Sequence, residues 1–234
     1  MMRLCDGFIT YTEEERRRLA RMHPEIRSFT APNACLPRAR IRYEASKRRK
    51  HVLYVGRLEE AKKPLLAVRA FLEATDHPGF NTETLLYLVG VGSLCPVIET
   101  ILQEHRCGDR VRLMGHIADE ECLERLYSEA CLSLSPGYIG LSAMQSFAFG
   151  IPMLVSRNEP HSPEVAMCEE GFNTRFIASG KVREWAGTIG EILRGEITFA
   201  SGEEISGRIR EQYSFEEMSE RFVEAVRAVS RKEA

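Results

Sequence analysis

Two cations that stand five residues apart, directly after an apolar run, could together hold an anion. The run is Val52–Val55, Gly56 follows it, and the cations are Arg57 and Lys62. An arginine fork can bind a phosphate through two hydrogen bonds, and a lysine at the mouth of the next helix adds a point charge beside the positive end of that helix. This pattern suits a diphosphate. The alternative is that both cations are solvated and paired with the two glutamates between them.

A second anion-binding pattern is a turn with two glycines, Gly90 and Gly92, between the apolar run Leu85–Val89 and a helical stretch. Glycines let backbone N–H groups approach an oxyanion, and the amino end of a helix favours negative charge. The full dinucleotide-binding fingerprint of three glycines is missing. A turn that is tight for packing alone is therefore the alternative.

The elements that must position these residues follow an α/β pattern. Apolar runs alternate with helical patterns from residue 51 to about residue 195, which predicts a Rossmann-like parallel sheet with helices on both faces. The expected strands are Val52–Val55, Leu85–Val89, Val111–Met114, Cys131–Leu134 and Met153–Val155. The expected helices are Pro64–Ala74, Cys95–Glu104, Asp119–Glu129, Leu141–Phe149 and Pro163–Cys168.

The two flanks differ from this α/β region. Residues 1–50 begin with a strand-like Phe8–Ile9, continue into a charged helix that Thr12 caps, and end in an irregular stretch; residues 1–30 are not expected to build a sheet of their own. Residues 196–234 carry two helical patterns, Glu203–Gln212 and Ser214–Ser230. The second has an apolar stripe that is expected to pack against the rest of the protein.

Composition restricts the partners and the compartment. A net charge of -2 over 234 residues argues against broad electrostatic binding to nucleic acid, and the short basic run Lys47–Lys50 is expected to be a solvated linker. The seven cysteines form no C-x-x-C pair, which favours reduced thiols in a cytoplasmic protein over a disulfide framework or a zinc site. No apolar run approaches the roughly 20 residues of a membrane span, so only peripheral membrane contact is compatible with the sequence.

Several motifs in order resemble those of one enzyme family. They are GRLEEAKK, the VGVG turn, Gly115-His116-Ile117, the block LSPG…GLSAMQSFAFGIPMLVS and the later HSPE. The set resembles the carboxyl-terminal, nucleotide-sugar-binding domain of family-4 glycosyltransferases of the GT-B fold. The resemblance covers about residues 51–230: it makes 51–195 the nucleotide-sugar-binding domain and 196–234 its C-terminal helices. Residues 1–50 resemble the end of an amino-terminal domain and its linker, with Pro32-Asn33-Ala34 at the junction.

The resemblance implies a retaining, metal-independent transfer of a sugar from a nucleotide-diphosphate donor to a glycan or other acceptor, in glycan or polysaccharide assembly. It implies no cofactor beyond the donor itself. Arg57 and Lys62 would be the catalytic residues, which stabilise the departing diphosphate. The donor would be bound by Gly56, Gly90, Gly92, His116, Ile117, Gly140, Leu141, Gln145 and Glu164.

The chain departs from this family at two carboxylates. The family's pair of glutamates, eight positions apart, falls on Gly137 and Gln145. The amide of Gln145 can still accept a hydrogen bond from a ribose hydroxyl, whereas Gly137 cannot replace a carboxylate. Glu164 either binds the sugar or caps the helix that it opens, and His116 is otherwise a loop residue.

On this resemblance, the 234 residues are expected to lack the acceptor half that such enzymes have. A separate subunit would supply that half, or the chain is a truncated fragment that is inactive alone. The last helix, which in GT-B enzymes crosses back to the first domain, would have little to cross to. The alternative from another class is a non-catalytic nucleotide-sugar-binding or scaffold module.

Overall fold

Alternating residues of the central strand are buried against two different helix layers. In this computed structural model, which describes residues 5–44 and 50–230, the central strand is β3 (His51–Val55). Val52 and Tyr54 belong to one apolar core, and Leu53 belongs to the other. Successive side chains of a strand point to opposite faces, so an unbroken apolar run is what a doubly covered strand requires.

Six parallel strands form the main sheet in the order β5-β4-β3-β6-β7-β8. Beyond β3, the strands are β4 (Leu86–Val89), β5 (Val111–Gly115), β6 (Ala130–Ser135), β7 (Met153–Ser156) and β8 (Thr174–Ile177). The five strands expected from the sequence are confirmed. The edge strand β8 is an addition, because its four residues alternate too briefly to stand out as an apolar run.

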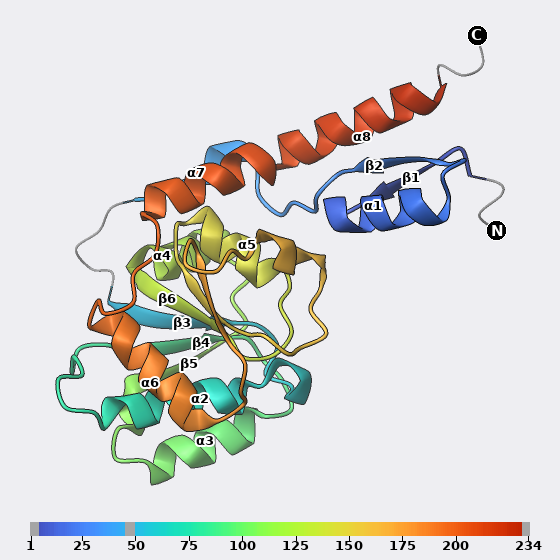
Figure 1. The fold of residues 1–234 in the computed structure, drawn as a ribbon. Coiled ribbons are helices and arrows are strands. Elements are labelled where there is room, and N and C mark those ends of the chain that lie inside the picture. Colours follow the sequence, from blue (N-terminus) through green and yellow to red (C-terminus); the bar gives the residue numbers. More distant parts are fainter. Residues whose placement is uncertain (1–4, 45–49, 231–234) are drawn as a thin grey trace.

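Helices cover both faces of this sheet (Figure 1). The first core joins the sheet to α2 (Pro64–Thr75), α3 (Cys95–Glu104) and α6 (Val182–Leu193). The second joins it to α4 (Glu120–Glu129), α5 (Leu141–Ala148) and α7 (Gly202–Gln212). Three-residue 3-10 turns are η2 (Arg38–Arg40), η3 (Glu60–Lys62) and η4 (Gly108–Arg110). The helix expected at Pro163–Cys168 is instead a short 3-10 element, η5 (Pro163–Met167).

The order of the strands reverses between β3 and β6. The chain runs outward from β3 to β4 and β5, returns to place β6 on the other side of β3, and continues outward to β7 and β8. At such a switch point, the loops after the two central strands turn away from each other and leave a crevice at the carboxyl edge of the sheet. The loops in question are those that follow Val55 and Ser135.

The amino-terminal residues do form a sheet, contrary to the expectation from the sequence. β1 (Gly7–Thr10) and β2 (Arg27–Thr30) pair in parallel, and α1 (Glu13–Met22) connects them. The Thr12 cap is confirmed, and a reciprocal bond with Glu15 completes a capping box. β2 escapes prediction because it is short and carries few apolar residues, so only its pairing with β1 makes it a strand.

The last helix, α8 (Phe215–Ser230), crosses back to this amino-terminal unit. The Arg27 guanidinium donates to the carbonyl of Ala228, and a Cβ atom at Gly7 would lie 3.1 Å from Val229. Figure 1 shows α8 lying along the β1–β2 pair. The expectation that the helix has little to cross to is therefore wrong.

The apolar stripe of α8 packs against the rest of the protein only in part, so the expectation of a packing helix holds for part of its length. Ala225 is buried, but Phe222 is 39% exposed and Val226 is 58% exposed. Met22 of α1 is 62% exposed as well. The amino-terminal unit is too small to cover this helix.

The basic run and the expected absence of a membrane-spanning helix can be compared with the structure only over the described residues. Three residues of the basic run, Lys47–Arg49, lie outside the described residues. Among the residues described, no helix is both long enough and apolar enough to cross a bilayer.

Candidate functional site

A cavity of about 210 Å³ opens at the switch point, between the carboxyl ends of β3 and β6. The β3 side contributes Tyr54, Val55, Gly56 and Lys62. The β6 side contributes Leu134, Ser135, Tyr138, Gly140, Leu141, Ser142 and Gln145. Four of the site residues that the sequence predicts, together with Lys62, thus line one cavity.

Both predicted cations reach across this crevice to a single residue of the β6 loop, Tyr138. The Arg57 guanidinium donates to its hydroxyl at 2.8 Å. The Lys62 ammonium donates to its carbonyl oxygen at 2.8 Å and lies 3.3 Å from the centre of its ring. Among the described residues, neither cation forms an ion pair with Glu59 or Glu60, and the Glu59 carboxylate instead accepts from the N–H and hydroxyl of Ser93. The other part of the alternative holds for Arg57, which is exposed to solvent.

The loop after β3 is shaped so that both cations face the crevice. The buried Tyr54 hydroxyl lies 3.1 Å from the carbonyl of Arg57 and 3.3 Å from that of Lys62, which ties the two ends of the loop together. Lys63 then adopts a left-handed conformation with φ of 50°, and Pro64 begins α2. A left-handed residue other than glycine costs about 1 kcal/mol, so the fold maintains this turn at some expense.

The amino end of α5 faces the same cations. Gly140 precedes the first residue of α5, Leu141, and a Cβ atom at Gly140 would lie 3.7 Å from the Lys62 ammonium. Amides in the first turn of a helix lack intrahelical partners and carry partial positive charge. Lys62 and this helix terminus therefore line one small cavity, and the exposed Arg57 adds a second cation at its edge through Tyr138. The arrangement favours a multiply charged anion.

Gly137, which the sequence marks only as the place of a missing glutamate, allows the β6 loop to lie close to Lys62. A Cβ atom at Gly137 would lie 2.4 Å from the carbonyl oxygen of Ala61 and 2.5 Å from the Cα atom of Lys62. The β6 loop therefore contacts the backbone of η3 directly, with no room for any side chain at this position. The sequence contains no signal for this contact, which joins residues about 75 positions apart.

A histidine fastens the other side of the β6 loop. The N–H of Ile139 donates to Nδ1 of His161 at 3.0 Å, so Nδ1 is the acceptor nitrogen. Nε2 then carries the hydrogen that is shared with the carbonyl of Ser156 at 2.8 Å. The neutral ring with hydrogen on Nε2 is thereby selected, and it ties the loop before α5 to the loop after β7.

The glycine turn after β4 lies against the turn after β3. A Cβ atom at Gly90 would lie 1.9 Å from the carbonyl oxygen of Gly56, and one at Gly92 would lie 2.3 Å from that of Leu58. The N–H of Gly90 donates to the carbonyl of Gly115. Both glycines thus have a packing role in the described structure, and neither lines the 210 Å³ cavity.

The remaining predicted residues surround the site at greater depth or distance. His116 is exposed and Ile117 is half-buried just after β5, outside the cavity lining. Glu164 is 8% exposed, and its carboxylate accepts from the side-chain amide of Asn33 at 2.9 Å. Glu164 therefore fastens the linker at the Pro-Asn-Ala junction, which is a third role beside the two expected ones.

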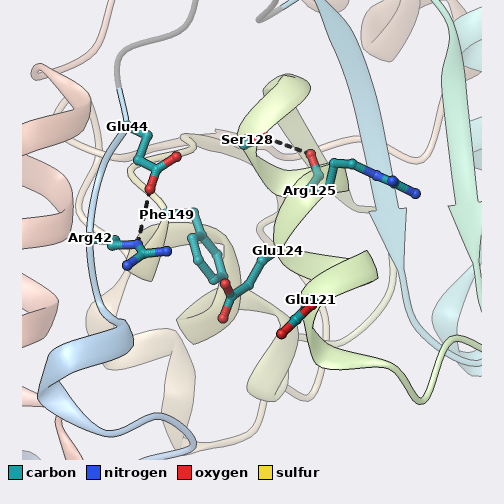
Figure 2. A pocket seen from close by; sticks show the side chains of 7 residues that line it. All are labelled: Arg42, Glu44, Glu121, Glu124, Arg125, Ser128 and Phe149. Atoms are coloured by element: carbon teal, nitrogen blue, oxygen red, sulfur yellow. Dashed lines mark hydrogen bonds and ion pairs between the residues drawn. The ribbon is translucent and has the colours of Figure 1, made fainter.

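A second cavity, of about 260 Å³, is lined by residues of α4 and of the segment before residue 45 (Figure 2). Arg42 pairs there with Glu44, and the Ser128 hydroxyl donates to the carbonyl of Arg125. The ring of Phe149 lies between these groups. Charges of both signs line this cavity, so it attracts an anion less strongly than the switch-point cavity does. Nor does any group of three or more His, Cys, Asp or Glu among the described residues form a candidate metal site.

The two cations and Tyr138 perturb one another. Partial burial holds the pKa of the Lys62 ammonium below its ordinary value of 10.5, and Arg57 lowers it further. The hydrogen bond from Arg57, followed by the charge of Lys62, holds the pKa of the Tyr138 phenol below its ordinary value of 10.0. Lysine is charged below its pKa and tyrosine above its own, so rising pH removes a cation and adds an anion at this site.

Affinity for inorganic pyrophosphate is therefore expected to fall with rising pH, and to do so at a lower pH than that at which an exposed lysine would lose its charge. Calorimetry on the unaltered chain, Lys62→Arg and Tyr138→Phe measures this, and the comparison cancels the titration of pyrophosphate itself. Each variant should lose part of the pH dependence. An identical dependence in all three proteins would contradict the assignment.

Residues 49–195 match the family described as "Glycosyl transferases group 1". No curated protein sequence matches the chain.

Several solved structures share the fold. Pneumococcal O-GlcNAc transferase GtfA, in complex with UDP and GlcNAc, has a TM-score of 0.71 at 21% identity, over 96% of this chain and 45% of that one. Anabaena HepE, in complex with UDP, has a TM-score of 0.71 at 14% identity, over 97% and 65%. Sucrose-phosphate synthase from Thermosynechococcus elongatus has a TM-score of 0.71 at 21% identity, over 96% and 58%. The chain thus spans less than two thirds of the length of each.

Proposed function

The chain belongs to the group 1 glycosyl transferases, and from this premise we propose that it binds a nucleotide-diphosphate sugar at the switch-point crevice. In this proposal it is the donor half of a family-4, retaining, metal-independent glycosyltransferase that acts in glycan or polysaccharide assembly. The observation that carries the proposal is that Lys62 and the amino end of α5 line one cavity, while Arg57 bonds to Tyr138 in its wall. A diphosphate is the anion whose charge and size suit that arrangement.

The proposed chemistry follows from where charge develops. When the bond between the sugar's anomeric carbon and the diphosphate oxygen breaks, the electron pair leaves with the diphosphate. Arg57 and Lys62 are already held at that place by Tyr138 and Tyr54, so they stabilise the new charge without reorganising. The acceptor hydroxyl oxygen then bonds to the anomeric carbon, and its proton passes to the departing diphosphate oxygen.

The other predicted residues are assigned to the donor by their place along the crevice. Gly140 and Leu141 would hold the diphosphate through backbone N–H groups. Gly56, whose own N–H donates to the carbonyl of Val89, would let the diphosphate approach the backbone closely. Gln145 lines the cavity one turn into α5, and its amide would accept from a ribose hydroxyl.

The outer residues would serve the ends of the donor. His116 and Ile117, which follow β5, would contact the nucleobase through their backbone. Gly90 and Gly92 would shape the turn beside it, and Glu164 would present its carboxylate to the sugar while Asn33 positions it.

We propose that the acceptor side comes from a further domain, either a longer form of this chain or a separate subunit. The open edges of the β1–β2 pair and the exposed stripe of α8 suit a domain that continues this sheet. Transfer needs both substrates in a closed, dry cleft, so the chain alone should bind donor yet transfer slowly.

A panel of UDP, GDP, ADP and their sugars, measured by thermal shift and calorimetry on the whole chain, tests the donor proposal. One nucleoside diphosphate and its sugar should raise the melting temperature, because a ligand that binds only the folded state stabilises it. Failure of every member to bind would overturn the proposal.

A non-catalytic nucleotide-sugar-binding module is the second candidate, because no side chain fits at Gly137, where the family has a glutamate. Both candidates bind donor nucleotide. They differ when an acceptor-side domain is supplied: the enzyme then transfers the sugar, whereas the module does not.

A further inference from the structure

Tyr138 contacts both cations of the crevice, yet its residue type belongs to none of the motifs that suggest a donor site. Its side chain accepts from the Arg57 guanidinium, and its ring lies below the Lys62 ammonium. The backbone carbonyl of the same residue accepts from Lys62. Two like charges that lie close together repel, so a group that bonds to both is needed to hold them there.

The position of Tyr138 depends on the glycine before it. Gly137 lets the β6 loop rest directly on the backbone of Ala61 and Lys62, and this contact brings the next residue over the ammonium. A glutamate at 137 would force the loop away. The missing carboxylate and the presence of the phenol at the cations are thus two consequences of one close approach.

The hydrogen bonds of the phenol leave its own proton available. The hydroxyl oxygen accepts from Arg57, so the O–H bond must point to another acceptor. Tyr138 also lines the switch-point cavity, together with Gly140 and Leu141 at the mouth of α5. An anion seated there would lie beside the hydroxyl.

We propose that Tyr138 is a donor-binding residue of this site: it holds Arg57 and Lys62 side by side and donates its hydroxyl hydrogen to an oxygen of the donor's diphosphate. The inference rests on the proposed function. Tyr138 adds a neutral hydrogen-bonding group to the two cations. Its hydroxyl discriminates a diphosphate, which reaches it, from a monophosphate, which does not.

The test compares Tyr138→Phe and Tyr138→Ala with Tyr87→Phe, a control in β4 whose ring packs edge-on against His51. Calorimetry measures UDP, GDP and ADP against the matching monophosphates on the whole chain. Removing one hydroxyl that donates to a charged oxygen should weaken diphosphate binding about tenfold or more. Monophosphate binding should change by less than about twofold, since a monophosphate lacks that contact.

Tyr138→Ala should weaken diphosphate binding more than Tyr138→Phe does, because it also removes the ring beneath Lys62. Equal diphosphate affinity in Tyr138→Phe and the unaltered chain would overturn the inference about Tyr138. The proposed donor site would still be supported in that case if the variant Arg57→Ala/Lys62→Ala loses diphosphate binding. If the unaltered chain binds no nucleoside diphosphate, the donor site and the inference fall together. Unchanged melting temperatures of the unliganded variants exclude misfolding as the cause of any loss.

Discussion

The double variant Arg57→Ala/Lys62→Ala is expected to lose nucleoside diphosphate binding. Each charge-assisted hydrogen bond that is lost costs about 1.5–3 kcal/mol, or roughly 10-fold to 150-fold in affinity. The two losses need not add, because both cations share Tyr138 as a partner. Calorimetry with UDP, GDP and ADP measures the effect.

A matched pair of surface cations provides the control. Lys50 pairs with Glu83, and Arg106 pairs with Asp76, both away from the crevice. The variant Lys50→Ala/Arg106→Ala removes the same net charge and should leave affinity nearly unchanged, because exposed pairs contribute little. Equal affinity in the crevice variant and the unaltered chain would remove the anion-site assignment.

Gly137→Ala and Gly137→Glu are expected to damage the site rather than repair it. A side chain at this position meets backbone atoms of Ala61 and Lys62, which cannot rotate away as a side-chain tip could. Overpacking of this kind costs about 1–3 kcal/mol of stability. The displaced loop would also carry Tyr138 off the cations, so diphosphate affinity should fall by about tenfold or more, in line with the loss of a charged hydrogen bond.

Gly180→Ala is the control for these variants. A Cβ atom there meets nothing within 4 Å, and its φ is not in the left-handed region. Thermal unfolding and calorimetry should therefore show little change. Tighter diphosphate binding in Gly137→Glu than in the unaltered chain would mean that the loop accommodates a carboxylate, and the explanation of Tyr138 through Gly137 would be wrong.

The sequence by itself determined five of the six strands of the main sheet and most of the helices between them, and it singled out the two cations. The strand runs, the helices between them and the Thr12 cap depend on the periodicity or capping of a few consecutive residues, which a sequence displays directly. Arg57 and Lys62 could be found because they lie within one strand–turn–helix segment. Local patterns were therefore sufficient to predict the main sheet and to propose an anion site.

Only the tertiary structure decided which partners those residues have. Tyr138 is 81 positions from Arg57, and Glu164 is 131 positions from Asn33. The pairing of β1 with β2 likewise joins residues 20 positions apart, from Gly7 with Arg27 onward. Such contacts are set by strand order and by how closely two backbones approach. At Gly90 and Gly137 the sequence shows only that a side chain is missing, and not which backbone lies against the glycine. A single sequence shows the absence, whereas the fold shows what fills the space.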